Sequence, residues 1–306
     1  MTTTTLIATP KLIDLSVNLA NGLKSLAKRS GIGLLELNNK LLLPIVQGGM
    51  GVGVSASRLA GTTARFGAMG TISSVDLRRL HADLWEQTKH LEKEPNARAL
   101  IDRANLVALD REIKKAKTLS QGNGMIAVNV MKALSAYDIY VKQALESGAD
   151  AVVVGAGLPL DLPDLAQDFP KAALIPILSD ARGVQLVVKK WMKKGRLPSA
   201  IVLEHPRLAG GHLGAAKVDD LTSERFEFET AIPQIIKAFR EMGIEGQIPL
   251  IAAGGISSLA DIKRLQALGA NAVQLGTAFA VTQECDANEN FKQVLARAKP
   301  EDTVEF

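Results

Sequence analysis

Cysteine is nearly absent from the sequence: Cys285 is the only one among 306 residues. One cysteine cannot form a disulfide within the chain, and no cluster of cysteine and histidine has the spacing of a zinc site. We therefore expect no metal and a reducing compartment, the cytoplasm by default. Because no base lies near Cys285 in the sequence, we do not expect it to act as a nucleophile.

Long hydrophobic runs and an excess of one charge are also lacking. No apolar stretch approaches the roughly 18 residues that cross a bilayer, and the Thr-rich segment 1–10 has no basic start or apolar core. Lys and Arg number 36 against 32 Asp and Glu, and they are scattered along the chain. These absences predict a protein that is neither exported nor membrane-spanning and that has no nucleic-acid partner.

Apolar residues make up 47% of the chain, enough for a large core. Short, almost continuously apolar runs bounded by turn residues are typical of parallel strands buried on both faces. Eight runs fit this description: Leu43–Gln47, Phe66–Thr71, Met125–Val130, Ala151–Gly155, Leu174–Leu178, Ala200–Leu203, Leu250–Ala253 and Ala272–Leu275.

Amphipathic stretches lie between these runs, and each is followed by a glycine that ends a helix. They are Ala133–Ser147, Val184–Lys194, Ala231–Met242 and Leu259–Leu268, followed by Gly148, Gly195, Gly243 and Gly269. Eight strands alternating with helices predict an α/β fold, a (β/α)8 TIM barrel, as a single domain over residues 1–306. An open doubly wound sheet is disfavoured because the dinucleotide-binding fingerprint is missing.

Two connections between strands are unusually long. The first contains a highly charged helical insertion at about 76–120, with a break at Glu94-Pro95-Asn96, and we expect its His81 and His90 at the surface. The second begins with the Gly-rich segment 209–214. Because active-site loops of such barrels follow the strand C-terminal ends, this segment is a candidate lid.

Glycine-rich turns follow the last two predicted strands, where barrels of this kind bind phosphate. Gly254 and Gly255 follow the seventh strand, and Gly276 and Thr277 follow the eighth. Their backbone N–H groups predict a phosphate site. The alternatives are a tight turn that needs small residues and a Thr277 that simply caps a helix.

Several polar residues follow or interrupt predicted strands. His212 stands between glycines with no apolar face to bury it, so we expect it to hold charge or move a proton beside a substrate. The amide of Asn129 interrupts an apolar strand and is either satisfied within the barrel or directed at a ligand. Asp180 and Arg182 either orient a substrate or pair with each other.

The segment before the Gly-rich loop is harder to interpret. His205 lies between Glu204 and Arg207, and a solvated or lid position is the plainer interpretation of this group.

Five motifs, in this order and at barrel spacing, resemble the nitronate monooxygenase family, formerly called 2-nitropropane dioxygenases. They are PIVQGGM at 44–50, AVNV at 127–130, AGGHLG at 209–214, IAAGGI at 251–256 and QLGTAF at 274–279. The resemblance implies a TIM barrel that binds FMN without a covalent bond. The residues implied around the phosphate and the ribityl chain are Gly254, Gly255, Gln274, Gly276 and Thr277, and those near the flavin are Asn129, Gly48, Gly49, Met50, Gly210 and Gly211.

The resemblance also implies an activity. In that family an anionic nitronate is oxidised with O2 to a carbonyl compound and nitrite, and His212 matches the active-site histidine. It would position the anion, acting as a base only on neutral nitroalkanes.

Two departures leave the substrate open. His205-Pro206-Arg207-Leu208 replaces the family's usual Gln-Gly-x-Glu, and the insertion after the second strand is longer than in the family's simplest members. An NAD(P)H-dependent flavin reductase acting on quinones or on enoyl thioesters, like enoyl-ACP reductases, is the first alternative. A non-catalytic barrel that binds a phosphate ligand is the second. The sequence also leaves the oligomeric state open, a homo-oligomer included.

Overall fold

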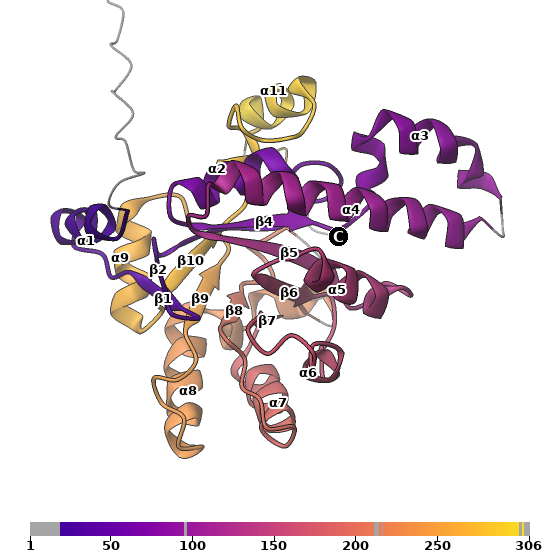
Figure 1. The fold of residues 1–306 in the computed structure, drawn as a ribbon. Coiled ribbons are helices and arrows are strands. Elements are labelled where there is room, and N and C mark those ends of the chain that lie inside the picture. Colours follow the sequence, from indigo (N-terminus) through magenta and orange to yellow (C-terminus); the bar gives the residue numbers. More distant parts are fainter. Residues whose placement is uncertain (1–18, 95–96, 211–213, 216, 300–301, 303–306) are drawn as a thin grey trace, which may run out of the picture.

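The computed structural model describes residues 19–94, 97–210, 214–215, 217–299 and 302. Eight parallel strands close into a barrel, confirming the predicted fold, and helices surround it (Figure 1). In ring order they are β10 (Ala272–Leu275), β3 (Ile45–Gln47), β4 (Met69–Ser73), β5 (Met125–Met131), β6 (Ala151–Gly155), β7 (Ala173–Leu178), β8 (Ile201–Glu204) and β9 (Leu250–Ala253).

The strands are buried on both faces, which explains their continuous apolar sequences. In β6, for example, Ala151 and Val153 belong to the cluster inside the barrel, whereas Val152 and Val154 pack under the helices. Strand β4 begins three residues later than predicted, because Phe66 ends the preceding helix and Gly67 turns the chain at φ +84°. The pattern therefore predicts which strands exist better than where they begin.

A hairpin that was not predicted from the sequence packs against the core inside the barrel. It consists of β1 (Leu35–Leu37) and β2 (Lys40–Leu42), joined by Asn38 and Asn39 with φ of 48° and 61°. Leu35, Leu37 and Leu42 are buried in the cluster that fills the barrel. The preceding helix, α1 (Leu19–Ser30), was also not predicted, and Figure 1 shows it beside α9 (Leu259–Leu268).

All four predicted helices form, with shifted ends in three cases. They are α5 (Tyr137–Glu146), α7 (Ala181–Met192), α8 (Phe228–Glu241) and α9, and the glycines expected after them all have positive φ. Helix α7 begins earlier than predicted because the Asp180 carboxylate accepts the N–H of Gly183 at 2.8 Å. A short α6 (Leu162–Leu165) links β6 to β7.

The predicted insertion contains one of the barrel's own helices. Short 3₁₀ turns at Leu77–Leu80 and Lys89–Lys93 flank α3 (Ala82–Thr88), and α4 (Arg98–Ser120) returns along α2 (Ser57–Arg65) (Figure 1). A β-carbon on Gly61 of α2 would lie 3.0 Å from the Ala116 carbonyl oxygen of α4, so the two helices touch closely. Among the described residues, no helix combines the length and apolarity needed to span a bilayer.

The C-terminal segment holds the start of α2. The Asp286 carboxylate accepts the backbone N–H groups of Ala56, Arg58 and Leu59 at 2.9 to 3.1 Å. These donors have no partner within the helix. Asp286 lies between α10 (Thr277–Ala280) and α11 (Glu289–Arg297), so it ties the chain's last part to the first barrel helix.

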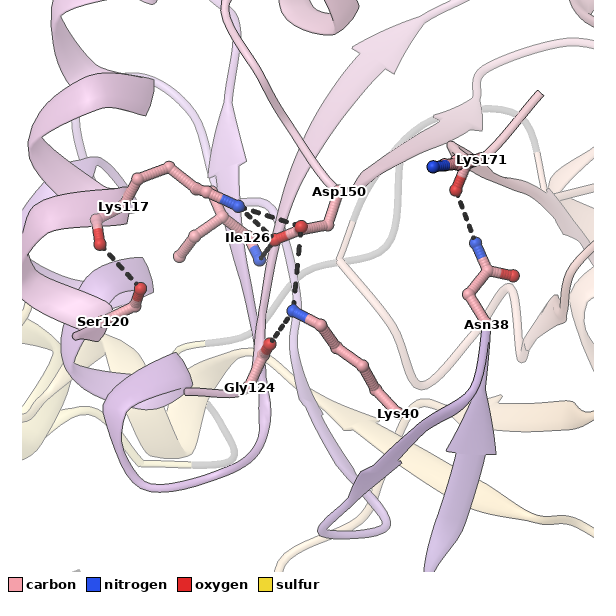
Figure 2. A network of polar contacts seen from close by, with 8 residues as sticks. All are labelled: Asn38, Lys40, Lys117, Ser120, Gly124, Ile126, Asp150 and Lys171. Carbon is pink, nitrogen blue, oxygen red and sulfur yellow. Dashed lines mark hydrogen bonds and ion pairs between the residues drawn. The ribbon is translucent and has the colours of Figure 1, made fainter. Parts of the chain in front are cut away.

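A carboxylate network ties elements together at the N-terminal end of the strands. Asp150, which precedes β6, accepts two bonds of 2.9 Å from Lys117 of α4 and one of 2.8 Å from the N–H of Ile126 in β5 (Figure 2). Lys40 of the hairpin lies 3.8 Å from the same carboxylate. Figure 2 also shows Asn38 donating to the carbonyl of Lys171. This end of the molecule is therefore built for stability.

Candidate functional site

A cavity of about 480 Å³ lies at the C-terminal ends of the barrel strands. Its lining comes from seven of the eight strand ends or the loops that follow them. The lining residues are Gly49, Met50, Gly51, Val52, Ser73, Val75, Asn129, Met131, Gly155, Ala156, Ile177, Glu204, Gly210 and Gln274. Five of these were predicted as cofactor-binding residues: Gly49, Met50, Asn129, Gly210 and Gln274.

Beside this cavity, the side chain of Gln47 joins β3 to β4. Its Oε1 accepts the N–H of Thr71 at 2.9 Å, and its Nε2 donates to the Thr71 carbonyl at 3.0 Å and to the Gly48 carbonyl. The backbone register between these strands has one pair, Val46 with Met69. The buried Gln47 amide thus takes the place of further backbone hydrogen bonds between β3 and β4. It also fixes the loop that carries Gly48 and Gly49.

Asn129 extends from β5 into the wall of the cavity. Its Nδ2 donates a long bond of 3.4 Å to the carbonyl of Val153, the one hydrogen bond its side chain makes to a described residue. A β-carbon on Gly49 would lie 2.4 Å from the Cβ of Asn129, so glycine is needed there for the amide to lie in the wall. The amide keeps unused hydrogen-bonding capacity beside the cavity.

Gln274 extends into the cavity from β10. Its Cγ lies 3.2 Å from the position a β-carbon would take on Gly48. The Met50 sulfur lies 3.6 Å from the same position on Gly276. Gly48 and Gly276 are therefore packed behind the lining side chains and are not part of the lining itself.

The two turns predicted to bind phosphate lie side by side, since β9 and β10 are neighbours in the sheet. Gly254 and Gly255 have φ of +115° and +66°, which L side chains rarely adopt. The N–H groups of Gly255 and Thr277 donate to no acceptor among the described residues. The Leu208 side chain packs on Gly255, 3.0 Å from where a β-carbon would be, and covers part of the turn.

Two predicted site residues, His212 and Gly211, lie outside the described residues. The glycines that flank them in the sequence are described. Gly210 lines the main cavity and has open space around it, and Gly214 packs against Pro206 and lines a neighbouring cavity. Both described ends of the loop therefore lie at cavity walls.

Glu204, at the end of β8, is the functional candidate that sequence reasoning missed. Its carboxyl lines the main cavity and has no hydrogen bond or ion pair with any described residue. Burial raises its pKa to about 7 from an ordinary 4.5. An acidic residue directly after an apolar strand of a parallel barrel could have been flagged, because ligands gather at that position.

The solvated interpretation of His205 is wrong. The ring is 2% exposed, packs edge-on to Phe228 at 5.7 Å and has its Nε2 3.5 Å from the Glu227 carboxylate. Its Nδ1 accepts the N–H of Arg207 at 3.3 Å. Helix α8 covers this residue from a distant part of the sequence, which local pattern does not reveal.

Other expectations need correction as well. Asp180 does not pair with Arg182, which is exposed; it caps α7 instead. His90 is exposed as expected, but His81 is half-buried, with Nε2 3.1 Å from the Glu112 carboxylate. The Cys285 thiol is buried and donates to the Val54 carbonyl, so its expected lack of a nucleophilic role is consistent with its surroundings.

Ala156, in the wall of the cavity, has an unusual backbone conformation. It lies between Gly155 and Gly157 with φ +56°, an uncommon conformation for a residue with a side chain, and it lines the cavity. Ser73, on β4, brings a further hydroxyl to the wall. Neither residue had a signal in the sequence strong enough to single it out.

The described residues fit a flavin nucleotide. The cavity offers small and apolar walls for a flat ring and the amides of Asn129 and Gln274 for its polar edge. The turns after β9 and β10, outside the lining of this cavity, add two unpartnered N–H groups for a phosphate. In this arrangement the Leu208 side chain, which packs on Gly255, lies beside the phosphate.

The family model "Nitronate monooxygenase" matches residues 36–306. A "probable nitronate monooxygenase" of Bacillus subtilis is 28% identical over 272 residues, which is 86% of this chain and 73% of that protein. One of Staphylococcus haemolyticus is 36% identical over 105 residues, 34% of this chain, and that match spans 28% of the relative's length.

A solved structure adds evidence on the fold. The structure of FabK from Thermotoga maritima matches with a TM-score of 0.61 and 21% identity, over 92% of this chain and 70% of that one. At this identity the likeness concerns the fold.

Proposed function

The chain belongs to the nitronate monooxygenase family of oxidoreductases, and we propose that it binds FMN and oxidises alkyl nitronates with O2. The products would be a carbonyl compound and nitrite. FMN supplies the electron-accepting chemistry when it is bound. A single domain and a cytoplasmic location belong to the same proposal, the latter in keeping with the free thiol of Cys285.

One observation carries the proposal. Gly49, Asn129, Gly210 and Gln274 come from four separate sequence motifs, and all four line one cavity at the catalytic end of the barrel. That convergence supports a ligand role, because unrelated core positions have no reason to meet at a cavity.

The residues of this chain have distinct tasks in the proposal. Gly254, Gly255, Gly276 and Thr277 would hold the phosphate through backbone N–H groups. Asn129 and Gln274 would hold the polar edge of the ring, with Gly49, Met50, Gly210 and Gly211 packed around it and Gly48 packed behind Gln274. His212 would position the anionic substrate and stabilise its charge.

The first experiment measures the flavin and what reduces it. Purified protein should be yellow and release FMN on denaturation. Anaerobic mixing with propionate 3-nitronate should bleach the flavin, whereas NADH and NADPH should act slowly. Rapid bleaching by a pyridine nucleotide without a response to nitronate would favour the flavin-reductase alternative, and a colourless protein would favour a non-catalytic binder.

A substitution tests the histidine. His212→Asn should lower nitronate turnover by roughly 10²-fold or more and leave the FMN content nearly unchanged. Loss of FMN from the variant would instead show that His212 has a structural role.

A further inference from the structure

A second cavity of about 320 Å³ adjoins the first on the side of β6, β7 and β8. The two share three wall residues: Ala156, Ile177 and Glu204. If the flavin occupies the first cavity, the second is the adjoining space from which a substrate can reach it. The shared residues then stand where the two molecules meet.

The walls of this side cavity suit an apolar group. Leu158, Ile177, Leu178 and Phe226 contribute aliphatic and aromatic surface, and Ala215 adds a small side chain. A short organic chain that packs on these residues is removed from water.

Arg225, the positively charged residue in the described lining of the side cavity, pairs with carboxylates other than Glu204. Arg225 lies 3.9 Å from Asp180 and 3.5 Å from Asp220, and it stacks on Phe226. Its positive charge is therefore shared by two carboxylates and is not available to attract an anion. A neutral substrate meets no electrostatic barrier at this wall.

Glu204 differs from these residues because its carboxyl has no partner among the described residues. It is the one Asp, Glu or His that the described linings of both cavities have in common. A largely buried carboxyl without a partner is costly to keep unless it has a function. Its neighbour His205 faces Glu227 instead, and no Lys or Arg lines the described part of the main cavity.

We propose, building on the proposed function, that the side cavity binds the organic group of a neutral nitroalkane and that Glu204, not His212, is the catalytic base that ionises it. His212 keeps the role of positioning the nitronate that results. In this step the bond between the α-carbon and its hydrogen breaks. The proton goes to a carboxylate oxygen of Glu204, and the electron pair moves into the nitro group. The product is the nitronate, formed beside the flavin that oxidises it.

The substitution Glu204→Gln tests this step, because it keeps the size of the side chain and removes the base. Turnover of nitroethane should fall by about 10²-fold or more, whereas turnover of preformed ethyl nitronate should change little. Glu36→Gln, at an exposed position of the hairpin, is the matched control. An equal effect on both substrates would overturn the proposal, as would a wild-type protein that oxidises nitronate and not nitroethane.

A second measurement separates this proposal from the proposed function. Infrared difference spectra of wild type minus Glu204→Gln should show a carboxyl that keeps its proton well above pH 4.5, even if no nitro compound is a substrate. A carboxyl that still holds its proton at the pH of full nitroethane turnover would overturn the assignment of Glu204, because a protonated carboxyl cannot accept the α-proton. If Glu204→Gln does not fold, Glu204→Asp should retain nitroethane turnover at a reduced rate, and full activity or none would argue against a base at this position.

The side cavity has its own test. Leu158→Trp should reduce kcat/KM for 1-nitrohexane about tenfold relative to nitroethane, because the indole fills space that a longer chain needs. An unchanged preference for chain length would exclude the cavity as the substrate pocket.

Discussion

Asn129 lies directly against Gly49: a β-carbon at position 49 would be 2.4 Å from the Cβ of Asn129. The two residues come from different strand ends, and their contact sets the shape of the cavity wall. The relationship explains why the loop after the first barrel strand needs glycine there.

Replacing Gly49 by Ala should therefore force the Asn129 side chain out of the wall. We expect a loss of about 1–3 kcal/mol in the free energy of unfolding and a reduced flavin content. Urea unfolding and flavin absorbance measure the two effects. Gly33→Ala is the control, since a β-carbon there meets Gln266 at an ordinary 3.4 Å; equal behaviour of both variants would contradict the prediction.

The cap of α2 predicts a long-range contribution to stability. Asp286→Ala leaves three N–H groups at the start of the helix without their acceptor, which should cost about 1–2 kcal/mol. Asp286→Asn retains an acceptor oxygen and should lose less. Thermal unfolding compares the two, and identical melting temperatures in wild type and both variants would show that the cap is not important.

The network in Figure 2 predicts a purely structural effect at the opposite end of the barrel. Asp150→Ala removes the acceptor for Lys117 and for the N–H of Ile126, and should cost about 2 kcal/mol because these groups are partly exposed. Lys40→Met should cost less, since its amino group lies 3.8 Å from the carboxylate and makes one hydrogen bond, of 2.9 Å, to the Gly124 carbonyl. The flavin content of both variants should equal that of wild type; a deficit would show coupling between the two ends.

The raised pKa of Glu204 predicts how stability depends on pH. Above pH 4.5 the unfolded chain has released this proton, whereas the folded chain keeps it until about pH 7. Because the folded state binds more protons in this range, the free energy of unfolding should fall by up to roughly 3 kcal/mol as the pH rises from 4.5 to 7, and stay low above it. Urea unfolding of flavin-free wild type and Glu204→Gln should diverge over this range, with the variant more stable at pH 8. Parallel curves would contradict the shift.

The barrel could be predicted from the sequence because its strands are buried on both faces. In β6, Val152 and Val154 pack against the helices, and Ala151 and Val153 pack inside the barrel. Successive residues of such a strand are therefore all apolar, a pattern that is visible in the sequence. The hairpin has a local signal as well, since Asn38-Asn39 between short apolar runs is typical of a two-residue hairpin turn.

The candidate site was only partly predictable. Glycine and amide residues next to strand ends, such as Gly49 and Gln274, carry a local signal. Glu204 has a weaker local signal, its position directly after an apolar strand. His205 has none, because α8 covers it from far along the chain. The cap on α2 is a stronger case, since Asp286 lies some 230 residues from the N–H groups it accepts.

The contact between β3 and β4, which depends on the Gln47 amide, is the weakest between neighbouring strands of the barrel. Elsewhere around the barrel, neighbouring strands share two to five backbone pairs, but β3 and β4 share one pair and the hydrogen bonds of the Gln47 side chain. The Thr71 N–H should therefore exchange with deuterium whenever the Gln47 side chain changes rotamer. Its exchange should be faster than that of the other N–H groups of β4. We expect the barrel to open locally between β3 and β4 first, directly beside the ligand-binding cavity.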